Sequence, residues 1–250
     1  MIKIRWFAKG ASDAGKAKDL AVVVDTLRCS SAVTTALEQK VNAIYPVSSV
    51  EVAFELRESE KFANSYGDPL LMGEVESVKV KGFDLGNSPT ELLLRSDLKG
   101  RNVLLRTSAG SQVLNSLGGA NEPSKIRAIV GCILNARSVA SFASRLALKE
   151  RRNISIICCG YQAREFALED FLGAGAIVSQ ISEGSFERSD EAIASCLAFE
   201  SSVDSLSKVL SETKSGRRLK ETGQSEDIEF CSELNKFNGV PIFDGKLISS

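Results

Sequence analysis

Residues 21–31 read AVVVDTLRCSS and join a buried strand to a helix. The apolar run before Asp25 indicates a strand that is buried on both faces and ends at a carboxylate. Arg28 follows three residues later, and Ser30 and Ser31 then open a stretch typical of a helix, AVTTALEQK. In parallel α/β sheets, ligands bind at such strand-to-helix junctions, outside the carboxyl ends of the strands. We therefore expect the functional site of this chain at Asp25.

Asp25 and Arg28 have two interpretations. In the first, they form an ion pair at the strand end. In the second, Asp25 holds a metal ion, and Arg28 binds an anionic ligand together with the N–H groups at the start of the next helix. A guanidinium fork suits phosphate or sulfonate oxygens, so the second interpretation predicts metal-assisted phosphate chemistry. The sequence of this segment leaves both interpretations open.

The composition excludes several classes of protein. The 250 residues carry a formal net charge of −1, so no basic excess indicates a nucleic-acid partner. No apolar run approaches the roughly 18 residues of a membrane span, and the N-terminus lacks the apolar region of a secretory signal. We expect a cytoplasmic protein with no membrane or nucleic-acid partner.

Histidine is absent from the chain. Its absence excludes Ser-His-Asp and Cys-His nucleophiles, phosphohistidine chemistry and histidine-ligated zinc. Six cysteines are present, but no CxxC pair, so zinc-ribbon spacing is missing as well. Any metal site must then depend on carboxylates, which favour hard ions such as Mg²⁺ or Mn²⁺.

Short apolar strands alternate with amphipathic helices along the chain. This alternation predicts an α/β fold with three layers, α/β/α, a mostly parallel sheet and a helical C-terminal part. Strands are expected at 2–7, 20–24, 43–47, 69–72, 102–106, 128–132 and 154–159, and helices at 30–40, 49–63, 89–95, 109–117, 136–149, 167–181 and 190–213. We expect a single domain over residues 1–250, with a subdivision near residue 183 as the alternative.

Further acidic and polar side chains follow other strands. Glu74 comes after the strand PLLM, and Asp84 lies in the glycine-punctuated loop GFDLGNSP, residues 82–89. In that loop Asn87 is a candidate ligand of the substrate, and Ser88 can cap the next helix. Each of these residues is also common in simple turns. As functional residues, the two carboxylates would be further metal ligands.

Two more strand ends carry candidate residues. Ser108 and Gly110 lie in the turn TSAGS after the strand NVLLR, where backbone N–H groups can bind oxyanions. Asp170 opens a helix after the strand ISIICC and is a candidate metal ligand. Its simpler interpretation is a favourable interaction with the helix dipole.

A metal-free mechanism is the main alternative. Cys158 and Arg164 have the C-x5-R spacing of cysteine phosphatases, in which the arginine lowers the pKa of the thiol and binds phosphate. Glu165, however, stands where those enzymes place Ser or Thr. A second alternative is a non-catalytic protein that binds anionic metabolites. Near the C-terminus, we interpret Asp227 and Glu229 as part of a solvated polar segment.

These segments together resemble the 2-phosphosulfolactate phosphatases, the ComB family. The resemblance is carried, in family order, by DTLRCSSAVTTAL (25–37), GE (73–74), GFDLGNSP (82–89), TSAGS (107–111), GCILNA (131–136), FALED (166–170), GAGA (173–176) and DIEFC (227–231). The sequence departs from the family pattern in the turn 106–110, which is less rich in threonine, and at Val75, where many relatives carry Arg.

The resemblance implies a ComB-like α/β fold and Mg²⁺-dependent hydrolysis of 2-phosphosulfolactate, or of a similar small 2-phospho acid, in coenzyme M biosynthesis. It also suggests self-association as a homodimer. The predicted catalytic residues are Asp25, Arg28 and Asp84; the predicted substrate-binding residues are Arg28, Ser30, Asn87, Ser88, Ser108 and Gly110; and the predicted Mg²⁺ ligands are Asp25, Glu74, Asp84 and Asp170.

Overall fold

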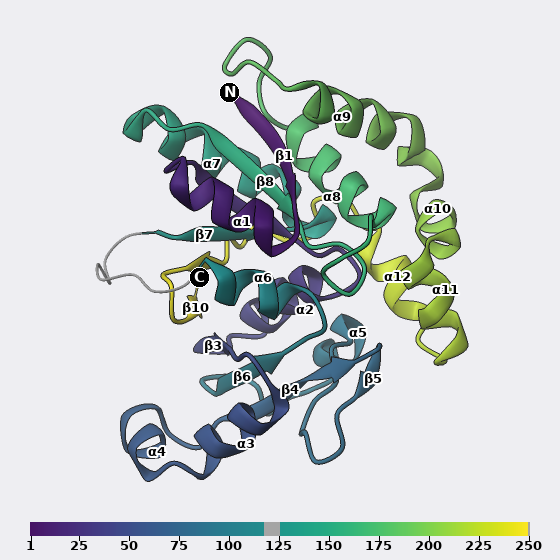
Figure 1. The fold of residues 1–250 in the computed structure, drawn as a ribbon. Helices are drawn as coiled ribbons and strands as arrows, with labels where there is room; N and C mark the ends of the chain where they lie inside the picture. Colours follow the sequence, from purple (N-terminus) through teal and green to yellow (C-terminus); the bar gives the residue numbers. More distant parts are fainter. Residues whose placement is uncertain (118–125, 250) are drawn as a thin grey trace.

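A computed structural model describes residues 1–117 and 126–249. Its centre is one sheet with the strand order β1-β8-β2-β7-β9-β10-β3-β6-β4-β5 (Figure 1). The strands are β1 (Ile2–Trp6), β2 (Leu20–Val24), β3 (Ala43–Pro46), β4 (Leu70–Val75), β5 (Val78–Lys79), β6 (Asn102–Arg106), β7 (Ala128–Gly131), β8 (Ile154–Cys158), β9 (Ile242–Phe243) and β10 (Ile248–Ser249).

Two parallel sets of strands make up most of the sheet. One set is β1, β8, β2 and β7, and the other is β3, β6 and β4. The C-terminal strands β9 and β10 join the sets through antiparallel pairs with β7 and β3. The expected α/β fold with a mostly parallel sheet is therefore confirmed.

The sequence of β2 shows why this sheet is buried on both faces. Successive side chains of a strand point to opposite faces. Val22 and Val24 accordingly pack into one core cluster, while Ala21 and Val23 pack into a second one. A continuous apolar run is typical of a parallel strand that is covered on both sides.

Helices cover both faces and complete three layers. Helices α7, α8 and α9 pack on the face of Val22 and Val24, whereas α1, α2 and α6 pack on the face of Ala21 and Val23. The helices are α1 (Phe7–Lys16), α2 (Cys29–Glu38), α3 (Val50–Glu58), α4 (Glu60–Tyr66), α5 (Pro89–Leu93), α6 (Gly110–Ser116), α7 (Ala136–Glu150), α8 (Leu168–Ser179), α9 (Asp190–Ser202), α10 (Leu206–Glu212), α11 (Lys214–Glu221) and α12 (Glu226–Cys231).

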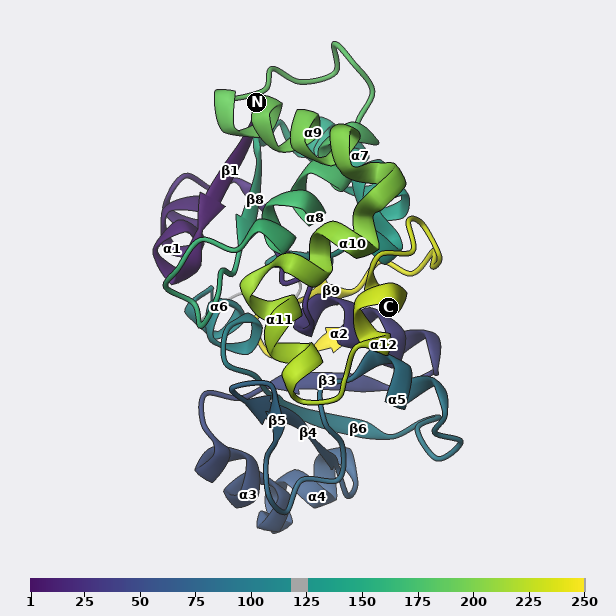
Figure 2. The same ribbon diagram turned by 90° about the vertical axis from the view of Figure 1, so that its right-hand side faces the viewer.

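The helices after residue 183 run down one side of the molecule. Figure 2 shows α9, α10, α11 and α12 in succession, from the start of β1 to the region of α5 and β5. Buried side chains of this part, among them Phe199 and Leu219, belong to the same core cluster as Ile4 of β1. The C-terminal helices are thus packed on the sheet and extend to the carboxyl end of β4.

The structure contains a helix that was not expected, and two of the expected helices are divided. The segment after β1 forms α1, a helix that was not predicted from the sequence; FAKGASDAGK contains three alanines but also two glycines, which disfavour a helix. It is stabilised by packing, because Gly10, Ala11 and Ala14 are buried. The helix expected over 49–63 is divided where Ser59 caps α4, and the helix expected over 190–213 is divided by a 3₁₀ turn, Val203–Ser205. Within the described residues, no helix is both long and apolar enough to cross a bilayer.

Candidate active site

A small pocket lies where the carboxyl ends of β2, β4, β6 and β8 come together. Four buried carboxylate side chains line it: Asp25, Glu74, Glu169 and Asp170. Its cavity volume is about 50 Å³. Three of the four predicted metal ligands therefore line the same pocket, although up to 145 positions separate them along the chain.

The turn after β2 is folded around Asp25. The side chain accepts a hydrogen bond from the backbone N–H of Cys29 at 3.2 Å, in the first turn of α2. The backbone N–H of Asp25 donates to the hydroxyl of Ser30 at 2.9 Å. Gly110 approaches the same carboxylate so closely that an added Cβ would lie 2.9 Å from Oδ2. Gly110 thus lets the start of α6 reach Asp25.

Asp170 connects the ends of two neighbouring strands. It lies in the first turn of α8 and is 3% exposed. One carboxylate oxygen accepts from the N–H of Thr26 at 2.8 Å, and the other accepts from the N–H of Gly160 at 2.7 Å. These two bonds hold the turn after β2 and the turn after β8 beside each other.

Glu74 and Ser108 connect β4 to β6 in a similar way. Glu74 accepts from the backbone N–H of Ser108 at 2.6 Å and from its hydroxyl at 3.1 Å. It also accepts from the N–H of Ser77 at 2.7 Å, within the tight turn between β4 and β5. The predicted substrate ligand Ser108 therefore lies at the pocket and holds a carboxylate there.

The carboxylates raise one another's pKa values. Burial, with the nearby charges of Glu74 and Glu169, raises the pKa of Asp25 to about 7, although the N–H groups of Cys29 and Gly110 oppose the shift. Burial and the charge of Asp25 raise the pKa of Asp170 well above its ordinary value. Burial also raises the pKa of Glu169. Without a cation, this pocket therefore disfavours the charged forms of its own side chains.

The donor set fits a hard divalent cation. All four side chains offer oxygen, and Oε2 of Glu169 is buried with no hydrogen-bond partner among the described residues. Within residues 1–117 and 126–249, no three acidic or thiol side chains meet closely enough to enclose a metal by themselves. Mg²⁺ does not need such an enclosure, because it commonly keeps several waters and takes only one or two carboxylates plus phosphate oxygens.

Arg28 pairs with a residue other than Asp25. Its guanidinium donates to Oδ2 of Asp227 at 2.5 Å, and both side chains are almost completely buried. It also contacts the side-chain oxygen of Gln224 and donates to the carbonyl of Ser77 at 3.3 Å. Of the two interpretations of Asp25 and Arg28, the structure removes the ion pair between them and leaves Asp25 without a cationic partner within the described residues.

Of the other predicted site residues, Asn87 lies at the pocket, whereas Ser88, Ser30 and Asp84 do not line it. Asn87 borders the pocket, and its buried Oδ1 has no hydrogen-bond partner among the described residues. Ser88 caps α5 and donates to Asp227 at 2.7 Å. Ser30 is turned toward the backbone of β2. Asp84 is not brought to the pocket: it accepts from the N–H of Leu71 at 2.7 Å and pairs with Arg57 at the surface.

The geometry does not support the cysteine alternative. The thiol of Cys158 is completely buried in the core, where burial and the charge of Asp170 raise its pKa well above the ordinary value. Arg164 is exposed and donates to the carbonyl of Gln162. A cysteine phosphatase needs an accessible thiolate beside its arginine, and Cys158 provides neither the access nor the charge.

Sequence reasoning underestimated two acidic residues. Asp227 does not belong to a solvated segment: it lies in α12, is 1% exposed and holds Arg28. Glu169 also lines the pocket and is 2% exposed, although only Asp170 was predicted as a ligand at the start of α8. A possible signal was its position directly before Asp170, since both lie in the first helical turn behind β8.

The raised carboxyl pKa values predict an unusual pH dependence of stability for the metal-free protein. The native state keeps a proton on Asp25 up to about pH 7, whereas the unfolded chain releases it near pH 4. The native state thus binds more protons between these values, so the free energy of unfolding falls as the pH rises from about 4 to 7. Each unit of pKa difference corresponds to about 1.4 kcal/mol.

Denaturant unfolding with EDTA at several pH values checks this contribution of Asp25 to stability, and Asp25→Asn should remove it. Equal pH dependence in both proteins would contradict the assignment.

Comparison with known proteins agrees with the class that the fold and pocket define, an α/β enzyme acting on phosphate esters. The profile of the 2-phosphosulpholactate phosphatase family matches residues 7–246. A probable 2-phosphosulfolactate phosphatase from Caldanaerobacter subterraneus subsp. tengcongensis is 37% identical over 88% of this chain and 86% of its own length. The probable 2-phosphosulfolactate phosphatase of Carboxydothermus hydrogenoformans is 36% identical over 93% and 91%. The 2-phosphosulfolactate phosphatase of Methanocaldococcus jannaschii is 30% identical over 91% and 90%.

The chain belongs to the 2-phosphosulfolactate phosphatase family and is a phosphoric monoester hydrolase. The resemblance identified from the sequence motifs is thereby confirmed.

Proposed function

We propose that this protein hydrolyses 2-phosphosulfolactate to sulfolactate and inorganic phosphate with Mg²⁺ as its cofactor. The observation that carries the proposal is the convergence of four buried carboxylates on one small pocket that Arg28 also borders. Membership of the family supports the substrate class. The raised pKa values of Asp25 and Asp170 support the cation, because these groups lack a positive partner within the described residues.

Each side chain has a proposed role. Asp25, Glu74 and Asp170 would hold Mg²⁺, with the unpaired oxygen of Glu169 as a further donor. When bound, Mg²⁺ neutralises charge on the phosphoryl oxygens and lowers the pKa of a coordinated water. Asp84 has no role in this proposal, because it lies elsewhere.

The anionic ester would be held by donors at the edge of the pocket. Arg28 offers a guanidinium and Asn87 a side-chain amide, whereas the hydroxyl of Ser108 at the pocket already donates to Glu74. Arg28 and Asn87 also border a neighbouring pocket of about 620 Å³. These groups therefore support binding of a substrate whose phosphate enters beside the carboxylates.

The size of the pocket matches one phosphoryl group of the substrate. A cavity of about 50 Å³ has room for about four waters, which is comparable to one phosphoryl group. Val75, the position at which many relatives carry Arg, is 42% exposed at the end of β4. Because this replacement of Arg by Val lies close to the site, the range of esters that the protein hydrolyses should be measured.

A panel of esters tests the proposed function. We expect the highest kcat/KM for 2-phosphosulfolactate, lower values for 2-phospholactate and phosphoglycolate, and phosphate release only when Mg²⁺ is present. The measurement is inorganic phosphate released over time at matched ester concentrations, with and without Mg²⁺. Tight binding of these esters without any release of phosphate would overturn the proposal in favour of a non-catalytic binding protein.

A further inference from the structure

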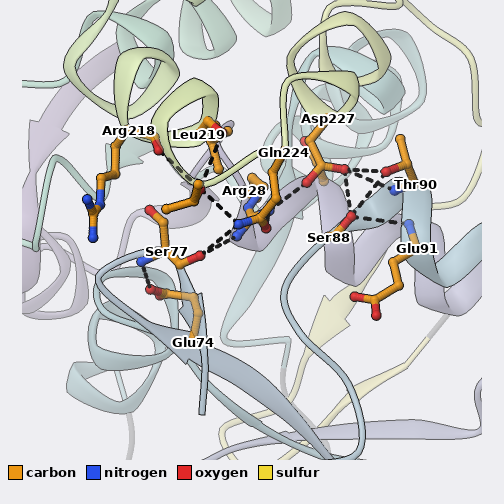
Figure 3. Close-up of polar contacts among 12 residues, drawn as sticks. Arg28, Glu74, Ser77, Ser88, Thr90, Glu91, Arg218, Leu219, Gln224 and Asp227 are labelled. Atoms are coloured by element: carbon orange, nitrogen blue, oxygen red, sulfur yellow. Dashed lines mark hydrogen bonds and ion pairs between the residues drawn. The ribbon is translucent and has the colours of Figure 1, made fainter. Parts of the chain in front are cut away.

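Asp227 is the most heavily hydrogen-bonded acidic side chain beside the pocket. Besides its 2.5 Å contact with Arg28, its second oxygen accepts from the hydroxyl of Ser88 at 2.7 Å and from the hydroxyl and N–H of Thr90 at 2.6 and 3.2 Å (Figure 3). The carboxylate does not line the small carboxylate pocket itself. It borders the larger neighbouring pocket together with Arg28, so Asp227 reaches the small carboxylate pocket only through the groups that it holds.

The orientation of Arg28 depends on this contact. A guanidinium binds oxygens in a fixed planar fork, so the direction of one N–H group determines the directions of the others. Asp227 and Gln224 both accept hydrogen bonds from one terminal nitrogen of Arg28, and the carbonyl of Ser77 accepts one from the other terminal nitrogen. The bond to Asp227 therefore fixes how Arg28 borders the pocket.

The contacts continue from Arg28 to Glu74. The carbonyl of Ser77 accepts from Arg28 and from Nε2 of Gln224 at 3.1 Å, while the N–H of the same residue donates to Glu74 at 2.7 Å. Arg218 of α11 also donates to the carbonyl of Glu76, the other residue at the tip of this turn. In Figure 3 these contacts lead from Asp227 through Arg28 and the backbone of Ser77 to Glu74. Helices α11 and α12 thereby hold the turn that carries a candidate metal ligand.

Stability alone is a weak explanation for such a pair. Removing two charges from water costs several kcal/mol per ion, and well-packed apolar residues often stabilise a core equally well. The pair lies beside the pocket: Arg28 itself lines it, and so does Ser77, whose carbonyl accepts from Arg28. Its location therefore favours a role in arranging the site.

We propose that Asp227 is a positioning residue, which orients Arg28 toward the substrate and, through Ser77, holds Glu74 toward the cation. This inference depends on the proposed function, because it assumes that Arg28 meets an anion and Glu74 meets a metal ion. Asp227 touches neither. It belongs to the site although it lies 202 positions after Asp25 in the chain.

The test compares two buried aspartates. Asp227→Asn keeps the shape of the side chain but removes its charge. Asp19→Asn is the matched control, because Asp19 is 3% exposed, pairs with Lys3 and Arg5 and lies at the opposite end of β2 from the site. For both variants and the wild type, calorimetry measures the affinities for Mg²⁺ alone and for inorganic phosphate. Kinetics on 2-phosphosulfolactate gives kcat and KM, and denaturant unfolding gives stability.

We expect Asp227→Asn to weaken both Mg²⁺ and phosphate binding and to raise KM, by about 10- to 100-fold, the range found when the residues behind metal ligands are replaced. Asp19→Asn should change stability but none of these affinities. Gln224→Ala, a change at a half-buried side chain, should weaken the same affinities to a smaller degree. If Asp227→Asn does not fold, this second variant decides the result.

Two results would overturn the inference. If Asp227→Asn matched Asp19→Asn in Mg²⁺ affinity, phosphate affinity and KM, Asp227 would be structural only. Unchanged affinities in Gln224→Ala, when Asp227→Asn cannot be folded, would lead to the same conclusion. Failure of the wild type to release phosphate from any ester would instead refute the proposed function, so the two failures are distinguishable.

Discussion

Replacing Asp25 with Asn should lower kcat/KM at least about a thousandfold. A metal ion supplies several kcal/mol of charge stabilisation in the transition state, and about 4 kcal/mol corresponds to this factor. The loss should come from chemistry and metal binding, since Asn has the same shape and keeps an oxygen for the N–H of Cys29. Steady-state kinetics at saturating Mg²⁺ measures the effect.

The fold should survive this change. Burial raises the pKa of Asp25 to about 7, so a neutral side chain removes an unfavourable buried charge in the metal-free protein. We expect the free energy of unfolding at pH 8, without Mg²⁺, to be at least that of the wild type. Asp19→Asn is again the control, because it changes a buried carboxylate at the other end of the same strand. Near-wild-type turnover by Asp25→Asn would show that Asp25 neither holds the metal nor takes part in the reaction.

Removing divalent cations should abolish phosphate release, and adding Mg²⁺ back should restore it. Among the described residues, the cationic side chain that lines the pocket is Arg28. Its guanidinium is already paired with Asp227. The charge of the ester must therefore be balanced mainly by an added ion. The measurement is phosphate release after EDTA treatment and again after dialysis into MgCl₂.

Cys158→Ser distinguishes this result from the cysteine mechanism. Because the thiol of Cys158 is buried in the core, we expect the variant to retain activity and to remain sensitive to EDTA. Activity that persists in EDTA and disappears in Cys158→Ser would establish the cysteine mechanism instead.

The local sequence predicted the parts of the site that depend on one strand and its turn. The run LAVVV indicates a strand covered on both faces, and parallel strands bring their carboxyl ends to common regions. For this reason Asp25, Glu74, Ser108 and Asp170 could each be placed at a strand end before the fold was described. The structure brings them together at one pocket.

Contacts across long distances in the sequence were beyond such reasoning. Arg28 could pair with Asp25 three residues before it or with a distant acid, and only tertiary packing selects Asp227, 199 positions away. Asp227 lies in a six-residue helix that carries three acidic residues, and these favour the interpretation as a solvated segment. Short helices are stabilised mainly by packing, so the sequence of α12 alone could not show that it is buried.

The position of Asp84 illustrates the opposite limit. Its glycine-rich loop is as compatible with a ligand-binding turn as with a structural one. In the structure, the carboxylate accepts the N–H of Leu71 and pairs with Arg57, which directs it away from the pocket. Choosing between these outcomes requires knowing which way one side chain points, and no local pattern contains that information.

An anomalous-scattering map of crystals grown with Mn²⁺ tests the central claim most directly. Mn²⁺ takes the same oxygen ligands as Mg²⁺ and can be located by its own signal. We predict a single strong peak at the pocket, within bonding distance of Asp25 and at least one of Glu74, Glu169 and Asp170, and its loss in Asp25→Asn. An active protein whose crystals show no Mn²⁺ among these carboxylates would contradict the account.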